Sequence, residues 1–369
     1  MEQVVLRNVT KRFTTKTLGD ITAVDNFNLS VHEGECFSFL GPSGCGKSTT
    51  LRMIAGFEDL NEGEIELCGR LVSSSAKKLY VPPEERGLGM VFQAFAVWPH
   101  MNVFENVAFP LRIAKMNKMD INKKVAEALK HTSLTGLEKT YPSDLSGGQQ
   151  QRIALARAIV TRPKVMLLDE PLSNLDPKLR ETMRFEIKEL QAKYGFTIIF
   201  VTHDQSEAMA ISDRMMVCDM GKIIQIDTPE NLYNHPINRF VHSFLGESTF
   251  INVNIKDGKT YADGDEVNPL PVSVPKDAAG RMTVATRPNS IVLTGSECEG
   301  YQSHVEKKIF LTDRTEYLIP VGSQVLKVQT PHRISFKRGE KCGVIFSSPT
   351  WYPYDDGEAE KQRNKRQTF

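Results

Sequence analysis

The sequence contains no long apolar run. Its longest apolar stretches, such as TIIFV at residues 197–201, are far shorter than the roughly 20 residues that a membrane-spanning helix needs. The opening residues, MEQVVLRNVTKRF, contain no apolar core of signal-peptide length. We therefore expect a protein of the cytoplasm that neither spans a membrane nor carries a secretion leader.

Paired cysteines and an excess of one charge are also missing. The six cysteines show no C-x-x-C spacing, so neither a disulfide framework nor a cysteine-bound zinc is expected. The 46 basic and 45 acidic residues give a net charge of +1, which offers no bulk attraction for nucleic acid or for an anionic membrane. A globular protein in a reducing compartment fits these absences best.

The chain is long enough for two domains. Its 369 residues exceed one ordinary core, and the sequence texture changes near residue 247. We predict an α/β domain over residues 1–246, a smaller all-β, barrel-like domain over 247–354 and a disordered tail over 355–369. Short runs of alternating apolar and polar residues, such as RMTVATRP and QVLKVQT, predict β strands. The polar, charged composition of residues 355–369 predicts disorder.

The stretch GPSGCGKST has the form of a phosphate-binding loop. An apolar run, GECFSFL, precedes it and a helical pattern follows it, which is the strand-to-helix context that a P-loop requires. Lys47 would reach the β- and γ-phosphates of ATP, and Ser48 would offer its hydroxyl to Mg²⁺. A glycine-rich turn with an incidental lysine is the alternative. The residues expected to bind ATP are Gly41, Pro42, Ser43, Gly44, Cys45, Gly46, Lys47, Ser48 and Thr49.

A second apolar strand ends in two carboxylates. It is the run KVMLLDEP, residues 164–171. Asp169 at the strand tip would hold Mg²⁺, directly or through water, and Glu170 would take a proton from the attacking water. Taken alone, Asp-Glu-Pro after a strand is equally typical of a turn. Together with the P-loop, it predicts an ATP-hydrolysing enzyme.

A third motif, LSGGQQQRIALARAI at residues 145–159, begins with a serine and two glycines and continues as an apolar helix face. Ser146 is typical of a helix N-cap. Glycine in a first helical turn costs stability, so Gly147 and Gly148 indicate that exposed backbone amides are needed there, as in a second anion site. The motif resembles the signature of ABC-type ATPases, and the resemblance extends over about residues 4–246.

The resemblance implies roles for residues that mean little alone. Gln93, which ends GMVFQ, matches the Q-loop glutamine; SNLD at residues 173–176 matches the D-loop; His203 in VTHDQSEAM matches the switch histidine. Phe13 in VTKRF fits the aromatic residue that stacks on adenine, although the family often has tyrosine there and a core phenylalanine is the alternative.

The family pattern then assigns the site. It implies catalytic roles for Glu170, His203 and Gln93, and Mg²⁺ binding by Ser48, Gln93 and Asp169. Two subunits would close face to face, with each ATP between the P-loop of one and the signature of the other. The residues expected to reach the partner's ATP are Ser146, Gly147, Gly148, Gln149 and Asp176.

The resemblance also implies an architecture and partners. We expect an inserted helical subdomain over about residues 94–160 and an oligonucleotide-fold-like C-terminal domain without nucleic-acid binding, since interleaved basic and aromatic positions are lacking. A homodimer would work at the cytoplasmic face of the membrane under two transmembrane permease subunits, fed by an extracytoplasmic solute-binding protein. Phe95, Trp98 and Phe104 would line the groove for the permease, or would simply pack the subdomain.

Other functions fit less well. A soluble repair ATPase would carry a coiled-coil insertion, and a translation ATPase would carry two cassettes. A non-catalytic module would not need Lys47, Asp169, Glu170 and His203 together, and an exporter fits poorly with the added β domain. The stretch from Pro82 to Leu111 looks more like ferric-iron importers than sugar importers, so ferric iron is the expected cargo, with polyamine, phosphonate and sugar as alternatives.

Overall fold

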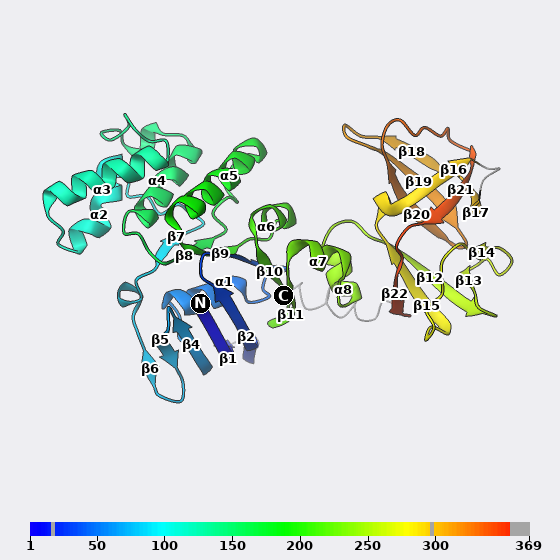
Figure 1. Ribbon diagram of the computed structural model, residues 1–369, viewed down its shortest axis with the longest axis horizontal. Helices are drawn as coiled ribbons and strands as arrows, with labels where there is room; N and C mark the ends of the chain where they lie inside the picture. Colours follow the sequence, from blue (N-terminus) through cyan, green and yellow to red (C-terminus); the bar gives the residue numbers. More distant parts are fainter. Residues whose placement is uncertain (16–18, 296–298, 355–369) are drawn as a thin grey trace. The chain divides into compact units, whose positions relative to one another are not determined.

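The computed structural model describes residues 1–15, 19–295 and 299–354 (Figure 1). It divides into two compact units, Met1–Ile237 and Asn238–Phe369. The fold class predicted from the sequence is confirmed: a mixed α/β P-loop unit is followed by a small all-β unit. None of the helices in residues 1–15, 19–295 and 299–354 combines the length and the hydrophobicity of a membrane span.

The first unit is built on a mostly parallel sheet with the strand order β11-β10-β3-β9-β8-β7. All neighbours pair in parallel except β11, which runs antiparallel to β10 at one edge. The strands β3, β8 and β9 are buried along their whole length, which explains their continuous apolar sequence. The strand bounds are β3 Cys36–Leu40, β7 Gly89–Val91, β8 Val165–Asp169, β9 Thr197–Val201, β10 Arg214–Asp219 and β11 Lys222–Asp227.

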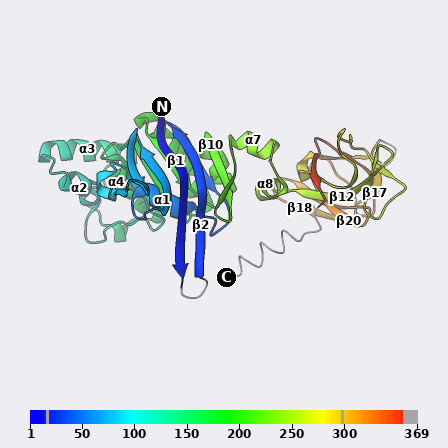
Figure 2. The ribbon, with the colours of Figure 1, turned by 90° about the horizontal axis from the view of Figure 1, so that it is seen from below.

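An antiparallel sheet in the order β2-β1-β4-β5-β6 packs beside it. Its long β1–β2 hairpin extends well past the other strands (Figure 2). The apolar core shared by the two sheets and helix α1 (Lys47–Ala55) includes Phe27, Phe37 and Ile54. The strand bounds are β1 Glu2–Thr15, β2 Gly19–His32, β4 Glu62–Leu67, β5 Arg70–Ser74 and β6 Leu79–Tyr80.

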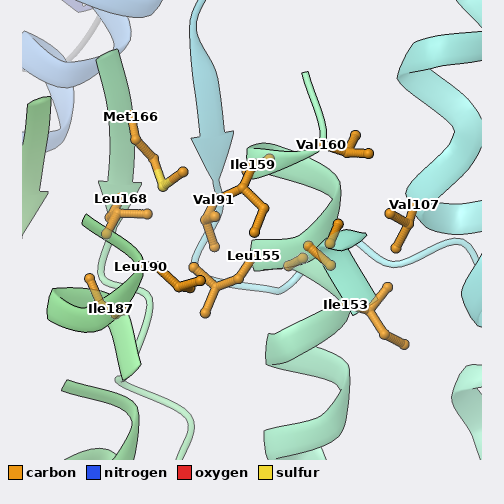
Figure 3. Packing of buried hydrophobic residues seen from close by; sticks show 14 of the residues in the cluster. Val91, Val107, Ile153, Leu155, Ile159, Val160, Met166, Leu168, Ile187 and Leu190 are labelled. Carbon is orange, nitrogen blue, oxygen red and sulfur yellow. The ribbon is translucent and has the colours of Figure 1, made fainter. Parts of the chain in front are cut away.

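The remaining helices of this unit include the inserted group that the sequence indicated. Leu155 and Ile159 of α4 pack in one core with Val91 of β7 and Leu190 of α5, so α4 fixes the inserted helices to the sheet (Figure 3). Capping boxes begin α2 and α4, at Asn102 and Ser146. The helix bounds are α2 Val103–Ile113, α3 Lys118–His131, α4 Gly147–Ile159, α5 Pro177–Tyr194, α6 Gln205–Ile211 and α7 Pro229–Asn234.

The second unit consists of helix α8 (Arg239–Phe244) and short antiparallel strands around an apolar core that includes Tyr317. Its sheets have the orders β14-β13-β12-β15-β22, β16-β21-β17 and β18-β19-β20. The strand bounds are β12 Thr249–Lys256, β13 Lys259–Ala262, β14 Pro269–Leu270, β15 Gly280–Thr286, β16 Ile291–Gly295, β17 Tyr301–His304, β18 Lys307–Phe310, β19 Thr315–Val321, β20 Gln324–Thr330, β21 Lys341–Phe346 and β22 Thr350–Pro353.

Helix α8 explains why the units divide before residue 246, where we placed the boundary from the sequence. The imidazole of His242 is hydrogen-bonded to the Tyr352 hydroxyl at 3.0 Å, and Arg287 donates to the His242 carbonyl at 2.8 Å. These contacts join α8 to β22 and to the residue that follows β15, both in the second unit. The tail predicted over residues 355–369 lies outside the described residues.

Candidate active site

The P-loop lies where the parallel strand β3 ends and α1 begins. Gly44 and Gly46 take left-handed backbone angles, with φ of 78° and 102°. A Cβ on Gly46 would lie 2.5 Å from the Ala23 carbonyl oxygen of β2, and one on Gly41 would lie 2.3 Å from that of Cys218 in β10. Neighbouring backbone therefore leaves no room for a side chain at either glycine, so the strands around the loop fix its shape.

Lys47 lies inside this loop. Its side chain is buried, and its Nζ donates to the carbonyl oxygens of Gly41 at 2.7 Å and of Pro42 at 2.8 Å. The loop thus holds a buried ammonium group beside the first amides of α1. A helix N-terminus with an adjacent cation is well suited to bind phosphate.

Ser48 and Asp169 meet at the edge of the sheet. The Ser48 hydroxyl donates to Asp169 Oδ1 at 3.2 Å, across 121 residues of sequence. Asp169 ends β8, and burial raises the pKa of its carboxyl group. A largely buried carboxylate beside a hydroxyl fits a small divalent cation, because oxygen is the donor that Mg²⁺ prefers and the cation offsets the cost of burying the charge.

Glu170, the next residue, has different partners. Its Oε2 accepts a hydrogen bond from Gln93 Nε2 at 3.1 Å and lies 3.2 Å from His203 Nδ1. The structure therefore brings together the three residues predicted to be catalytic. Gln93, which we also expected beside Ser48 at the metal, instead contacts Glu170, and Asn174 Nδ2 donates to its carbonyl at 2.9 Å.

The backbone of Glu170 is left-handed, with φ of 44°, which is unfavourable for a residue with a side chain. Two neighbours hold it there. The Glu170 amide donates to the Val201 carbonyl at 2.9 Å, and the Ser173 hydroxyl donates to the Glu170 carbonyl at 3.0 Å. Because the backbone turns here, the Glu170 carboxylate does not follow the alternation of β8 and instead reaches Gln93 and His203.

The signature residues lie at the exposed start of α4. Ser146 is the N-cap, and its hydroxyl accepts from the Gln149 amide while the Gln149 side chain accepts from the Ser146 amide. A Cβ on Gly148 would lie 2.6 Å from Leu179 of α5, whereas one on Gly147 would meet nothing closer than 3.9 Å. Packing within the subunit explains Gly148 alone, and Gly147 remains exposed.

These residues are not joined to the P-loop within one chain. Among the described residues, no hydrogen bond links residues 146–149 with residues 41–49. Asp176, expected to act in the partner's site, caps α5 locally by accepting from the Leu179 amide at 3.0 Å, and it is otherwise exposed.

Phe13 lies on the β1–β2 hairpin with 36% of its surface exposed, so it is not a core phenylalanine. Lys11 Nζ lies 4.9 Å from the centre of its ring. Phe13 pairs with Ile21, two residues before Ala23, the residue whose carbonyl meets Gly46. The pairing of β1 with β2 therefore places the exposed ring of Phe13 on the same hairpin that contacts the P-loop through Ala23.

The aromatic residues after Gln93 are half-buried rather than exposed. Phe95 and Phe104 pack on the core of the helical region, and Trp98 packs against Phe109 with ring centres 4.3 Å apart and ring planes inclined by 45°. Arg157 of α4, which sequence reasoning missed, donates to the Phe95 and Ala96 carbonyls at 3.1 and 2.7 Å. Its position on the polar face of the signature helix was the only signal available.

Three kinds of comparison bear on this site. The ABC transporter family model matches residues 24–173. The spermidine/putrescine import ATP-binding protein PotA of Rubrobacter xylanophilus is 45% identical over 356 residues, covering 94% of this chain and 92% of that protein. The protein of the same name from Acidothermus cellulolyticus is 44% identical over 327 residues, covering 86% and 83%.

Among solved structures, a dimeric post-hydrolysis state of the ATP-binding cassette MJ0796, bound to ADP and Pi, is 34% identical with a TM-score of 0.53. It covers 61% of this chain and 98% of that one. The site geometry, the family model and a 45% identical relative that extends over both units agree. The chain therefore belongs to the ABC transporter family of ATP-binding proteins, which couple ATP hydrolysis to transport.

Proposed function

We propose that this chain is the ATP-hydrolysing subunit of an importer for polyamines such as spermidine and putrescine. The observation that supports it is the length of the aligned region: the 45% identity to the Rubrobacter xylanophilus protein extends over 94% of the chain and so includes the β unit as well as the ATP motifs. The names of these relatives favour polyamine over ferric iron, the cargo that we expected from the sequence, and over phosphonate and sugar. Full-length similarity to import proteins also disfavours a soluble non-transport ATPase.

ATP binding follows from the P-loop geometry. The phosphates would lie on residues 41–49, where the ammonium of Lys47 exchanges its carbonyl partners for phosphate oxygens. Ser48 and Asp169 would hold Mg²⁺, which neutralises phosphate charge when bound. The exposed ring of Phe13 would stack on the adenine.

Hydrolysis would use the cluster around Glu170. A carboxylate that already accepts hydrogen bonds can accept the proton of a water placed between it and the γ-phosphate. Gln93 and His203 would turn from Glu170 toward that water and the phosphate, where their N–H groups stabilise developing negative charge. The Q-loop would thereby sense the nucleotide and pass its state to the helical region.

The signature residues support a homodimer. Gly147 is open although nothing among the described residues of its own subunit requires the space. Ser146 beside it, at the start of α4, and Asp176, at the start of α5, are exposed as well. Two solved structures of the cassette MJ0796 are described as dimeric. We propose that two subunits cover each other's γ-phosphates and act on two transmembrane permease subunits at the cytoplasmic face of the membrane, with an extracytoplasmic binding protein delivering the polyamine.

Uptake measurements test the cargo. Cells lacking this gene should lose most ATP-dependent uptake of labelled spermidine or putrescine and keep ferric-iron uptake. The wild-type gene should restore it, and the matched Glu170→Gln variant should not. Normal polyamine uptake in the deletion strain, together with lost iron uptake, would reject the polyamine proposal and would make ferric iron the favoured cargo.

A further inference from the structure

Arg180, the fourth residue of α5, contacts two loops that carry predicted active-site residues. Its Nε donates to the Leu175 carbonyl at 2.8 Å, and its Nη2 donates to the Ser173 carbonyl at 2.9 Å. Both acceptors belong to the D-loop, residues 173–176. The guanidinium therefore fixes the backbone of that loop through two hydrogen bonds from one rigid plane.

The other edge of the guanidinium faces the segment that carries His203. Arg180 Nη1 lies 3.9 Å from Asp204 Oδ2 and 3.9 Å from Glu207 Oε1. The Glu207 carboxylate is buried and accepts from the Thr202 hydroxyl at 2.6 Å, and the same hydroxyl accepts from the Asp204 amide at 3.0 Å. Thr202 and Asp204, on either side of His203, are thus joined to the Glu207 carboxylate through the Thr202 hydroxyl.

The D-loop in turn holds Glu170. The Ser173 amide and hydroxyl donate to the Glu170 carbonyl at 3.3 and 3.0 Å. Since His203 lies 3.2 Å from the Glu170 carboxylate, the contacts form a closed ring: Glu170, Ser173, Arg180, the start of α6 and His203. Arg180 is the member that contacts both the D-loop and the start of α6.

We propose that Arg180 is a positioning residue for ATP hydrolysis. By holding the D-loop beside the segment 202–207, it keeps the side chains of Glu170 and His203 at their contact distance of 3.2 Å. It acts through these loops and not on the nucleotide. The proposal depends on the ATPase activity of the family and not on the polyamine cargo, so a failure of the uptake experiment leaves it intact.

This positioning depends on the shape of the side chain as well as on its charge. A lysine would keep a positive charge near Asp204 and Glu207, which lie at ion-pair distance. Its single ammonium cannot present the planar fork that donates to the Leu175 and Ser173 carbonyls at once. A glutamine removes the charge as well. Because a displacement of about 1 Å at a catalytic group can cost on the order of 100-fold in rate, both changes should affect kcat more than ATP binding.

The test compares Arg180→Lys and Arg180→Gln with Arg184→Gln in the full-length protein. Arg184 is the matched control: it lies one turn further along α5 and donates to the Ser206 carbonyl of α6 at 3.1 Å, and in the part of the chain that the structure describes it makes no hydrogen bond or ion pair with residues 173–176. The measurements are kcat and KM for basal ATP hydrolysis, the Kd for ATP, and the melting temperature. A Ser173→Ala variant, alone and combined with Arg180→Lys, measures coupling.

We expect kcat to fall roughly 10-fold in Arg180→Lys and roughly 100-fold in Arg180→Gln, with KM and Kd within about 3-fold of wild type. Arg184→Gln should stay near wild type, and the double variant should lose less than the product of the single losses. Wild-type kcat in Arg180→Gln, equal losses in Arg184→Gln, or strictly multiplicative losses in the double variant would each overturn the proposal. A kcat loss that follows a lowered melting temperature and weakened ATP binding would show a structural role instead.

Discussion

His242 should make the stability of the β unit depend on pH. Its side chain is 3% exposed, its Nδ1 is hydrogen-bonded to the Tyr352 hydroxyl, and its Nε2 has no partner among the described residues. Burial, and then the nearby charge of Arg287, lower its pKa to about 4. The folded unit therefore holds His242 neutral, whereas the unfolded chain protonates it near pH 6.5.

The sign and size of the effect follow from this difference. Because the native pKa is depressed, the stability is fully present above pH 6.5 and is lost as pH falls toward 4. Each pH unit in that window costs about 1.4 kcal/mol, so lowering the pH from 8 to 5 should cost the β unit about 2 kcal/mol through His242. Other titrating groups also change the unfolding free energy with pH. Comparison with a variant that lacks only His242 cancels their contribution.

The assay is urea unfolding at pH 8 and pH 5, followed by the fluorescence of Trp351, which lies next to Tyr352 in β22. A Trp98→Phe background leaves Trp351 as the single tryptophan, since the chain has two. His242→Asn places an amide near the hydroxyl of Tyr352 but cannot titrate. Its pH-dependent loss should be smaller than that of the parent protein by about 2 kcal/mol. Equal losses in the two proteins would refute the argument that His242 is kept neutral.

Three further predictions concern the ATPase unit. Glu170→Gln should bind ATP but lower turnover by about 10²–10⁴-fold, measured by steady-state hydrolysis, because it keeps the shape and removes the base. In a forced dimer, Lys47→Ala on one subunit and Ser146→Arg on the other should leave one site able to trap nucleotide with vanadate, whereas both lesions on one subunit should leave none; equal trapping would defeat the shared site. Gly148→Ala should lower the unfolding free energy by about 1–2 kcal/mol relative to Gly147→Ala, because only the former meets a leucine of α5; equal melting curves would contradict this.

Much of the nucleotide site was predictable because its signals are local. A buried strand, a glycine-rich loop with Lys47 and a following helix fall within about twenty residues, and Asp169 follows an apolar run directly. The spacing of hydrophobic residues and the positions of glycines predict such elements from the local sequence alone. The structure confirmed the fold class on these grounds and placed Asp169 within hydrogen-bonding distance of Ser48.

The contacts between loops were not predictable in the same way. Gly147 and Gly148 look alike in sequence, and only the position of Leu179 on α5 separates a glycine required by packing from one left open. Arg180 looks like an ordinary charged helix residue until the segment 202–207 is placed beside it. The sequence left open whether Trp98 and Phe104 line a groove or pack the helical region, because the contact of Trp98 with Phe109 and that of Phe104 with the core appear only in the folded chain. Such facts depend on tertiary packing, which no single window of sequence contains.

The two adjacent carboxylates, Asp169 and Glu170, show how tertiary contacts give neighbouring residues different partners. Asp169 still belongs to β8, and its side chain reaches Ser48 beside the P-loop. Glu170 leaves the strand with a left-handed backbone, and its carboxylate reaches Gln93 and His203. That conformation is costly for a residue with a side chain, so it persists only because the Val201 carbonyl and Ser173 hold it on both sides. The different positions of the two carboxylates therefore require the D-loop and β9 to be in place. Because Arg180 contacts the D-loop through two hydrogen bonds, its proposed effect on the rate would act through this support of Glu170.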